Sequence, residues 1–216
     1  MSIELVIFDL DGTLVDSIED IADSVNYALG EIGSAPLTLD EVKMLVGAGV
    51  ENLLLKAAGI GEHDIVKKDR LKSIFLSHYT MHIADKSRPY NNVIKTLGEL
   101  HGINKAVVSN KLFSLTKSLL DKLSMLEYFK VVYGYDSCPD RKPSPVPIIK
   151  LMEQFELSVK QTIIIGDSGT DIEAGHAAGI KAVAVSYGYR AVDTLRAADY
   201  IIDDMSEIIP IIKALH

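Results

Sequence analysis

The sequence has a single cysteine, Cys138, among its 216 residues, so an intrachain disulfide is impossible. We therefore expect a reducing, intracellular environment. No apolar stretch approaches the roughly 20 residues that span a bilayer. The short apolar run near the N-terminus has no basic segment before it, so a signal peptide is not expected either. These features predict a soluble, cytoplasmic protein.

Positive charge is also scarce. The 22 Lys and Arg residues are outnumbered by 30 Asp and Glu residues, which gives a formal net charge of −8. A surface of this sign is a poor match for nucleic acid or for an anionic membrane, so we expect neither as a partner. An anionic small molecule would need a local positive pocket. The chain is 48% hydrophobic and 24% charged, which is typical of a globular protein of one or two domains.

Short apolar runs recur along the chain and predict strands that are buried on both faces. The runs are Ile3–Phe8, Lys105–Val108, Val131–Tyr133, Thr162–Ile165, Ala182–Val185 and Tyr200–Ile202. Segments with helical periodicity lie between them, at Asn91–Leu100, Leu112–Leu126, Val146–Phe155 and Thr170–Ala178. This alternation predicts an α/β fold, a doubly wound parallel sheet covered by helices on both faces.

One region breaks the alternation, because residues 16–84 contain no convincing strand. Its helical signals are the spacing of Ile18, Ile21, Val25 and Leu29, a capping-box pattern over Thr38–Glu41, and a helical pattern over Lys67–His82. We therefore expect a small α-helical domain at 16–84. It would be inserted into an α/β core formed by residues 1–15 and 85–216, with the chain re-entering the sheet domain near Pro89.

Two carboxylates leave the first predicted strand together, in the sequence Phe8-Asp9-Leu10-Asp11-Gly12-Thr13. Burial of either acid without a partner would cost several kcal/mol, and a divalent cation would relieve that cost. Gly12 permits the backbone turn that folds Asp11 toward Asp9. An ordinary Asp-Gly turn with solvated acids is the alternative interpretation.

A second acidic pair, Asp167 and Asp171, follows the apolar run Ile163–Ile165. Ligands in open parallel sheets bind beyond the carboxyl ends of the strands. Asp9, Ser109 and Asp167 all lie within two residues of a predicted strand end, so we expect them to cluster. The simpler interpretation is that Asp167 or Ser168 caps the next helix and Asp171 complements its dipole; the two interpretations are compatible.

The residue types near these acids favour magnesium and phosphate. Carboxylate oxygens with no Cys or His nearby suit a hard cation, Mg²⁺ before zinc, and Mg²⁺ is often held by one or two carboxylates together with substrate phosphate. Ser109 and Asn110 stand where a strand opens into a helix, which is a ready anion site. Lys142 precedes another helix between flanking prolines, although a solvated surface cation is the simpler interpretation of a single lysine.

In order and position, these segments resemble the four motifs of the haloacid dehalogenase-like hydrolases. The matching residues are Asp9–Thr13, Ser109, Lys142-Pro143, and Gly166-Asp167 with Asp171. The resemblance covers the whole chain and includes a helical cap after the first motif. Within this superfamily the sequence resembles the phosphoglycolate phosphatase branch, on Phe8–Ser17, Val46–Val50, Lys142–Pro147 and Tyr187–Tyr189. Ser109 stands where threonine is common in this branch, and both residues present a hydroxyl.

The resemblance implies a Rossmann-like core and a Mg²⁺-dependent phosphatase of small phosphomonoesters, with 2-phosphoglycolate the leading substrate. Asp9 would be the nucleophile that forms an aspartyl-phosphate. Asp11 would protonate the leaving oxygen and then deprotonate the hydrolytic water. The metal ligands would be Asp9, Asp11 through its backbone carbonyl, and Asp167, with Asp171 acting directly or through a water.

The resemblance also implies roles for the remaining motif residues. Lys142 would offset the repulsion between an anionic nucleophile and an anionic phosphate. Ser109, with the neighbouring Asn110, would hold a phosphoryl oxygen, and Thr13 would support the loop. The expected partner is a small phosphorylated metabolite, and the protein would be a monomer or homodimer.

A glycine-rich loop in the helical insertion, Gly47-Ala48-Gly49, sits between two helical stretches. Backbone amides in such a loop can approach an anion, which suits a substrate with a carboxylate. An ordinary glycine-rich helix break is the alternative. His78 and His82 have the i, i+4 spacing of metal ligands, but no third ligand follows, so we expect them to share one helix face.

Three other functions remain open from the sequence. A pyrophosphatase or another small-metabolite phosphatase of the same branch would keep every catalytic residue. A β-phosphoglucomutase-like phosphomutase would also keep them, with cap groups that hold a sugar bisphosphate. A non-enzymatic phospho-receiver module uses clustered aspartates and one lysine too, but the inserted cap and Asp11 argue against it.

Overall fold

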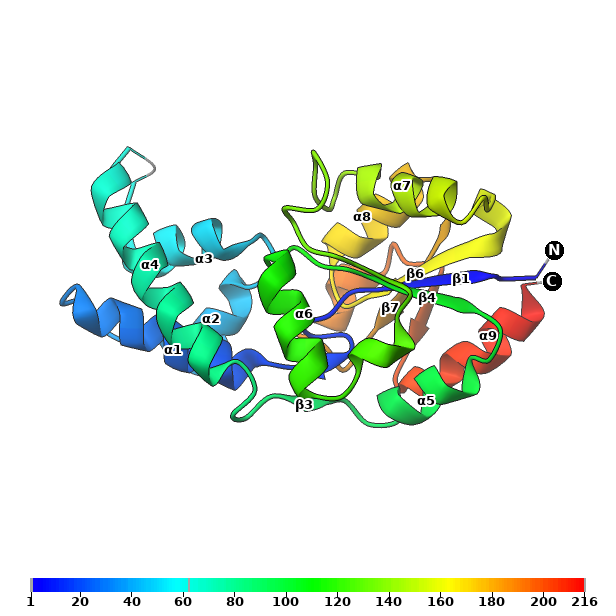
Figure 1. The fold of residues 1–216 in the computed structure, drawn as a ribbon, viewed down its shortest axis with the longest axis horizontal. Helices are drawn as coiled ribbons and strands as arrows, with labels where there is room; N and C mark the ends of the chain where they lie inside the picture. Colours follow the sequence, from blue (N-terminus) through cyan, green and yellow to red (C-terminus); the bar gives the residue numbers. More distant parts are fainter. Residues whose placement is uncertain (1, 62, 216) are drawn as a thin grey trace. The chain divides into compact units, whose positions relative to one another are not determined.

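The computed structural model describes residues 2–61 and 63–215. The chain forms two compact units: residues 1–16 together with 89–216, and residues 17–88 (Figure 1). Two short strands that the sequence did not predict, β2 (Val15–Asp16) and β3 (Arg88–Pro89), form a separate two-stranded sheet where the chain passes from one unit to the other. Within the described ranges, no helix combines the length and apolar character needed to cross a membrane.

The larger unit is built on a parallel sheet of six strands in the order β5-β4-β1-β6-β7-β8. The strands are β1 (Leu5–Phe8), β4 (Asn104–Val108), β5 (Val131–Tyr133), β6 (Thr162–Gly166), β7 (Lys181–Val185) and β8 (Tyr200–Ile202). Every residue of β1 and β6 is buried, as expected for central parallel strands with both faces covered. The apolar runs of the sequence therefore mark the strands correctly, to within two residues at each end.

Helices cover both faces of this sheet. They are α5 (Val93–Glu99), α6 (Phe113–Lys122), α7 (Val146–Gln154), α8 (Gly169–Ala177) and α9 (Ile208–Ala214), joined by the short 3₁₀ helices η1 (Leu126–Tyr128), η2 (Val159–Gln161), η3 (Val192–Leu195) and η4 (Met205–Glu207). Figure 1 shows α7 and α8 on one side of the sheet and α5 and α9 on the other. The predicted doubly wound α/β fold is confirmed.

Two helices, α5 and α6, are shorter in the structure than the sequence pattern predicted. The helix expected over Leu112–Leu126 ends at Lys122, and Ser124 follows in the left-handed region with φ 54°. The helix expected from Asn91 begins at Val93, because Asn92 has φ 58°. A left-handed residue cannot continue a right-handed helix, so each marks a helix end that the apolar spacing alone does not reveal.

The smaller unit consists of α1 (Ile18–Glu31), α2 (Leu39–Leu45), α3 (Val50–Ala58) and α4 (Ile65–His82). The predicted capping box opens α2: Thr38 Oγ1 accepts a hydrogen bond from the Glu41 amide, and Glu41 Oε2 accepts one from the Thr38 amide at 2.7 Å. Apolar side chains of all four helices are buried, among them Val25, Leu29, Val42, Leu53, Leu54, Leu71 and Phe75. Burial of these stripes stabilises the helices in water.

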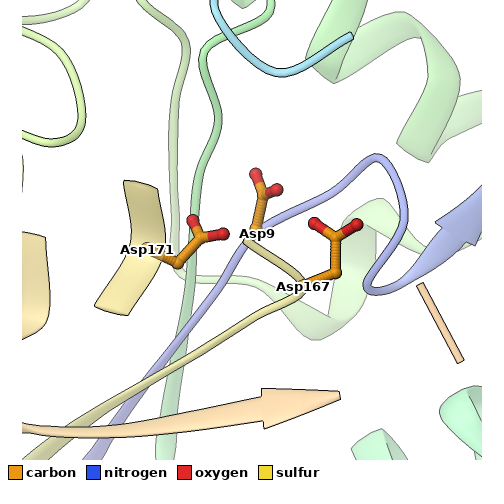
Figure 2. Close-up of side chains that lie close together, drawn as sticks. All are labelled: Asp9, Asp167 and Asp171. Carbon is orange, nitrogen blue, oxygen red and sulfur yellow. The ribbon is translucent and has the colours of Figure 1, made fainter. Parts of the chain in front are cut away.

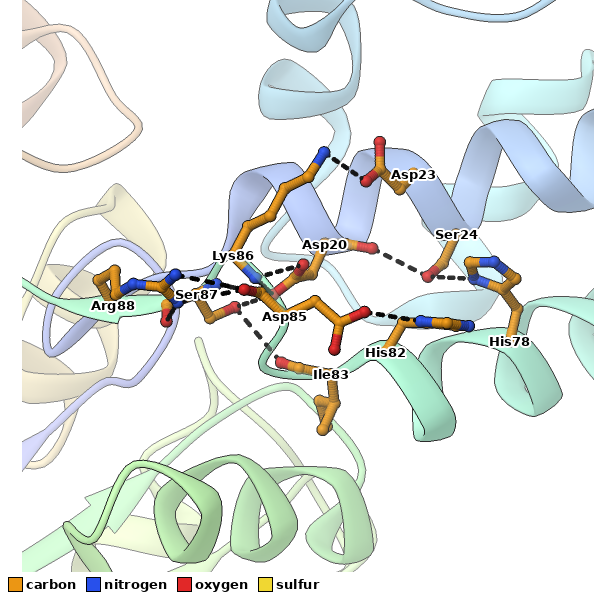
Figure 3. Close-up of polar contacts among 10 residues, drawn as sticks. All are labelled: Asp20, Asp23, Ser24, His78, His82, Ile83, Asp85, Lys86, Ser87 and Arg88. Atoms are coloured by element: carbon orange, nitrogen blue, oxygen red, sulfur yellow. Dashed lines mark hydrogen bonds and ion pairs between the residues drawn. The ribbon is translucent and has the colours of Figure 1, made fainter.

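A buried carboxylate fastens the chain after α4 to the first turn of α1 (Figure 3). Asp20 Oδ2 accepts hydrogen bonds from the Ser87 amide at 2.8 Å and from Ser87 Oγ at 2.6 Å. The Lys86 amide donates to both oxygens of Asp20. The Asp20 side chain thereby joins α1, the first helix of the helical unit, to Lys86 and Ser87 near the end of that unit.

The two histidines of α4 lie on one face of the helix, as expected. Their rings are 4.4 Å apart between centroids. His78 Nδ1 lies 3.0 Å from Ser24 Oγ, and His82 Nδ1 lies 2.7 Å from Asp85 Oδ2. Both contacts are made inside the helical unit (Figure 3), and the pair is not part of any group of three potential metal ligands among residues 2–61 and 63–215.

Candidate active site

Three neighbouring strands deliver the first site residues to one edge of the sheet. β1 lies between β4 and β6, and Phe8 pairs with Val107 on one side and Ile165 on the other. Asp9 follows β1 directly, and its amide donates to the Ile165 carbonyl at 2.9 Å. Ser109 follows β4 and Asp167 follows β6. The position expected for a ligand in such a sheet is beyond these carboxyl ends.

Three carboxylates converge at this edge. One oxygen each from Asp9, Asp167 and Asp171 can be chosen so that all lie within 4.8 Å of one another. Figure 2 shows the Asp9 carboxylate between those of Asp171 and Asp167. Asp167 and Asp171 are buried, and the Asp9 side chain is 14% exposed. Residues more than 150 positions apart in the sequence thus meet in one partly enclosed acidic group.

Lys142 supplies positive charge to this group. Its Nζ lies 2.9 Å from Asp9 Oδ1 and 2.5 Å from Asp171 Oδ1, and the residue is 3% exposed. The Asn110 side-chain amide donates to the Lys142 carbonyl at 2.9 Å and holds the lysine backbone in place. Lys142 is therefore not the solvated surface cation that a lone lysine usually is.

The acidic group carries more negative charge than Lys142 can balance. Burial, more than any other cause, raises the pKa of Asp9 to about 7, although Lys142 acts in the opposite direction. Burial and the charges of Asp9 and Asp171 raise the pKa of Asp167 to about 8. Burial lowers the pKa of Lys142, but its two aspartate partners outweigh this and the net pKa is raised. A cation among these carboxylates would remove the repulsion, and an all-oxygen set fits a hard divalent ion.

Asp171 has a second task at the start of α8. Ser168 is the N-cap of the helix, and its hydroxyl donates to Asp171 Oδ2 at 2.6 Å while Asp171 Oδ1 accepts from Lys142. Asp171 therefore supports the helix start through Oδ2 and faces Lys142 through Oδ1, so a contact with the helix start does not remove it from the group of acids. Ser168, not Asp167, is the capping residue.

Asp167 is positioned by close backbone contacts that the sequence analysis did not assign. The Tyr189 amide donates to Asp167 Oδ2 at 2.7 Å. A Cβ atom at Gly12, whose φ is +86°, would overlap that oxygen, and one at Gly188 would lie 2.8 Å from it and 2.6 Å from the Gly12 carbonyl oxygen. Tyr187–Tyr189 entered the sequence analysis only as a mark of the branch, because the spacing gives no reason for its contact with Asp167.

Asp11 is paired with a second lysine. Lys111 Nζ lies 2.7 Å from Asp11 Oδ1 and 2.8 Å from Oδ2, with the two side chains 8% and 11% exposed. The sequence pattern assigned no role to Lys111. Its place, two residues after Ser109 and three after the end of β4, is the signal that could have identified it.

The remaining predicted site residues are placed as follows. The Ser109 amide donates to the Tyr133 carbonyl at 3.0 Å, and Ser109 Oγ accepts from the Lys111 amide at 3.2 Å. Thr13 is fully buried, and its carbonyl accepts from the Tyr187 hydroxyl at 3.0 Å. Gly47-Ala48-Gly49 lies in the loop between α2 and α3 of the helical unit, and its role in substrate binding stays a prediction.

Comparisons with known proteins agree on one family. The family model described as "Haloacid dehalogenase-like hydrolase" matches residues 6–185. A phosphoglycolate phosphatase of Agrobacterium fabrum is 36% identical over 211 residues, which cover 95% of this chain and 91% of that protein. A phosphoglycolate phosphatase of Chromobacterium violaceum is 33% identical, with 98% and 97% of the two chains covered.

A comparison of the fold with solved structures supports the same family. A crystal structure described as that of a predicted phosphoglycolate phosphatase from Haemophilus somnus superposes with a TM-score of 0.90 at 32% sequence identity, and the match covers 98% of each chain. Sequence and fold thus agree over nearly the whole length. The chain belongs to the haloacid dehalogenase-like hydrolases.

Proposed function

We propose that the protein is a Mg²⁺-dependent phosphatase of small phosphomonoesters that works through an aspartyl-phosphate on Asp9, and that 2-phosphoglycolate is its substrate. The observation that carries the proposal is the position of the Asp9 carboxylate, between two other carboxylates and against a buried lysine, at the carboxyl end of the central strand. The two relatives and the solved structure described above are all named as phosphoglycolate phosphatases, the last as a predicted one.

Asp9 is suited to act as the nucleophile. It is the most accessible of the three clustered carboxylates, and its main chain is fixed by the bond to the Ile165 carbonyl. One Asp9 oxygen attacks phosphorus as the bond to the leaving oxygen breaks, and this forms an acyl phosphate. Lys142, 2.9 Å from Asp9 Oδ1, lowers the repulsion between the carboxylate and the incoming phosphate.

Asp9, Asp167 and Asp171, with the Asp11 backbone carbonyl, are the residues that would hold Mg²⁺. The bound ion supplies positive charge that screens the phosphate from the carboxylates. The Tyr189 amide, together with Gly12 and Gly188, keeps the Asp167 carboxylate in one orientation. Ser109 offers its hydroxyl for a phosphoryl oxygen, with Asn110 beside it, and Thr13 supports the loop.

Asp11 acts as general acid and then as general base. It donates a proton to the departing alkoxide, and its carboxylate then accepts a proton from the water that attacks the acyl phosphate. Asp11 lies in the tight turn that follows Asp9. Two backbone hydrogen bonds fix this turn: the Gly12 amide donates to the Val15 carbonyl and the Leu14 amide to the Leu10 carbonyl, both at 2.9 Å.

Residues 17–88 form the cap in this proposal, and the Gly47-Ala48-Gly49 loop contributes to recognition of the substrate carboxylate. A helical cap of this kind excludes water and selects the substrate, while the core supplies the chemistry.

A substrate panel tests the proposal. We expect Mg²⁺-dependent phosphate release from an aryl phosphate, and a higher kcat/KM for 2-phosphoglycolate than for pyrophosphate, sugar phosphates or nucleotides. Chelation of the metal should abolish release from every ester. If pyrophosphate or a sugar bisphosphate had the highest kcat/KM, the proposed substrate would be wrong and the proposed chemistry would stand. Absence of any metal-dependent phosphate release would refute the whole proposal.

A further inference from the structure

Lys111 is the buried cation of the site to which no motif gives a role. Its ammonium contacts both oxygens of Asp11, at 2.7 and 2.8 Å. Lys142 contacts Asp9 and Asp171 instead. The two lysines therefore serve different acids, and the task of Lys111 has to be sought at Asp11.

The main chain of Lys111 is well anchored. Its amide donates to Ser109 Oγ at 3.2 Å, and its carbonyl accepts from the Tyr135 amide at 2.9 Å. It also follows β4, which pairs with β1 through Val107 and Phe8, so the segments that carry Lys111 and Asp11 leave adjacent strands. Because the backbone of Lys111 is fixed by these hydrogen bonds, its long side chain can hold the Asp11 carboxylate in a defined position.

The pair is shielded from solvent, since the Lys111 and Asp11 side chains are 8% and 11% exposed. Exposed ion pairs contribute about 0–1 kcal/mol, but removal of one partner from a buried pair is far more costly because it leaves an uncompensated charge. A bond to both carboxylate oxygens also restricts rotation about the Asp11 side-chain torsions. Loss of Lys111 would remove both of these bonds from the Asp11 carboxylate.

We infer that Lys111 is a positioning residue, which holds the Asp11 carboxylate in the orientation needed for proton transfer. The inference rests on the proposed function, because it takes the acid–base role of Asp11 from there. In the general-acid step one oxygen of Asp11 carries the proton and Lys111 holds the other oxygen; once the proton has gone to the leaving oxygen, Lys111 bonds to both oxygens, as in the structure. Proton transfer depends steeply on geometry, so a misplaced acid loses much of the roughly 10²–10⁴-fold that general acid–base catalysis contributes.

The test compares Lys111→Met, which keeps length and removes charge, with Lys111→Arg, which keeps charge. Kinetics are measured with Mg²⁺ on an aryl phosphate and on a simple alkyl phosphate. For Lys111→Met we expect kcat on the alkyl ester to fall about tenfold or more, a smaller fall on the aryl ester, and KM values within about twofold of wild type. Lys111→Arg should recover part of the loss. Lys117→Met, on the exposed face of α6, is the matched control and should leave both esters unaffected.

A double-mutant comparison adds a sharper criterion. In an Asp11→Asn background, Lys111→Met should cause no further loss beyond about twofold, because both changes remove the same acid–base function. Thermal unfolding of each variant checks that the fold is intact. The NMR signal of the Asp11 side-chain carboxyl carbon gives a readout without turnover: one sharp resonance in wild type, shifted or broadened in Lys111→Met.

Several results would overturn the inference. A raised KM with unchanged kcat would make Lys111 a phosphate-binding residue, and a raised kcat would mean that the pair restrains Asp11 in an unproductive orientation. Equal losses on both esters, additive losses with Asp11→Asn, or an unchanged Asp11 resonance would also contradict it. Failure of the proposed function gives a different result, since wild type would then release no phosphate or Asp9→Asn would retain full turnover.

Discussion

The orientation of the Asp167 carboxylate depends on a few close contacts with backbone atoms. The Tyr189 amide fixes one of its oxygens at 2.7 Å, and Gly12 and Gly188 leave no room for a Cβ atom beside that oxygen. A glycine is therefore needed at position 188 for reasons of space, although the sequence gives no sign of it. The two glycines together define the orientation of a carboxylate that we propose as a metal ligand.

Gly188→Ala tests this packing. The added methyl group would overlap Asp167 and lie 2.6 Å from the Gly12 carbonyl oxygen, so the carboxylate must shift. We expect Mg²⁺ affinity, measured by titration calorimetry, to fall about tenfold or more, since displaced ligands and their supports cost about that factor. Unfolding free energy should fall by about 1–3 kcal/mol.

Gly98→Ala is the control for this substitution, because a Cβ atom at this helical position meets nothing within 4 Å. It should leave Mg²⁺ affinity unchanged and stabilise α5 slightly. Mg²⁺ affinity in Gly188→Ala equal to that of wild type would show that the close approach of Gly188 does not position Asp167.

Strands and helices differ in how far the sequence predicted them. The buried parallel strands appear as continuous apolar runs such as Thr162–Ile165, so all six were predicted. The ends of α5 and α6 were not, because Asn92 and Ser124 adopt left-handed conformations that apolar spacing does not encode. The pair β2 and β3 was missed for another reason: two-residue strands are too short to show any periodicity.

Asp20 in α1 offers a test of how the helical unit is closed. Asp20→Ala would remove the acceptor of the buried Ser87 amide and of the partly buried Lys86 amide, and would leave the Ser87 hydroxyl with the Ile83 carbonyl at 3.3 Å. Each lost bond to a charged acceptor costs about 1.5–3 kcal/mol, so we expect the free energy of unfolding to fall by about 3 kcal/mol or more in urea. Hydrogen exchange of the Ser87 amide should accelerate.

Asp23→Ala is the matched control for Asp20→Ala. Asp23 lies one turn further along α1 and pairs with Lys86 Nζ at 2.7 Å, with both side chains about half exposed. An exposed pair of this kind contributes about 0–1 kcal/mol. If the two variants lost similar stability, the hydrogen bonds to Asp20 would not be what fastens the chain after α4.

The clustered acids and lysines come from four segments of the larger unit, and a fifth segment, Tyr187–Tyr189, contacts Asp167 and Thr13. Strand ends and residue types were enough to predict that Asp9 and Asp167 would meet, because parallel strands share one carboxyl edge; Ser109 follows the neighbouring strand β4, and its place in the site stays a prediction. The contact between Lys111 and Asp11 and the burial of Lys142 depend on side-chain directions and loop paths. These follow only from the packed tertiary structure, so the sequence alone could not give them.

The proposed chemistry depends most on Asp9 as the residue that receives the phosphoryl group. The direct measurement is acid quenching of the enzyme during Mg²⁺-dependent turnover of a radiolabelled phosphate ester, followed by peptide mapping. We predict acid-stable label on the peptide that contains Asp9, and neither label nor turnover in Asp9→Asn. Turnover with the label on another residue, or sustained turnover by Asp9→Asn, would contradict the account.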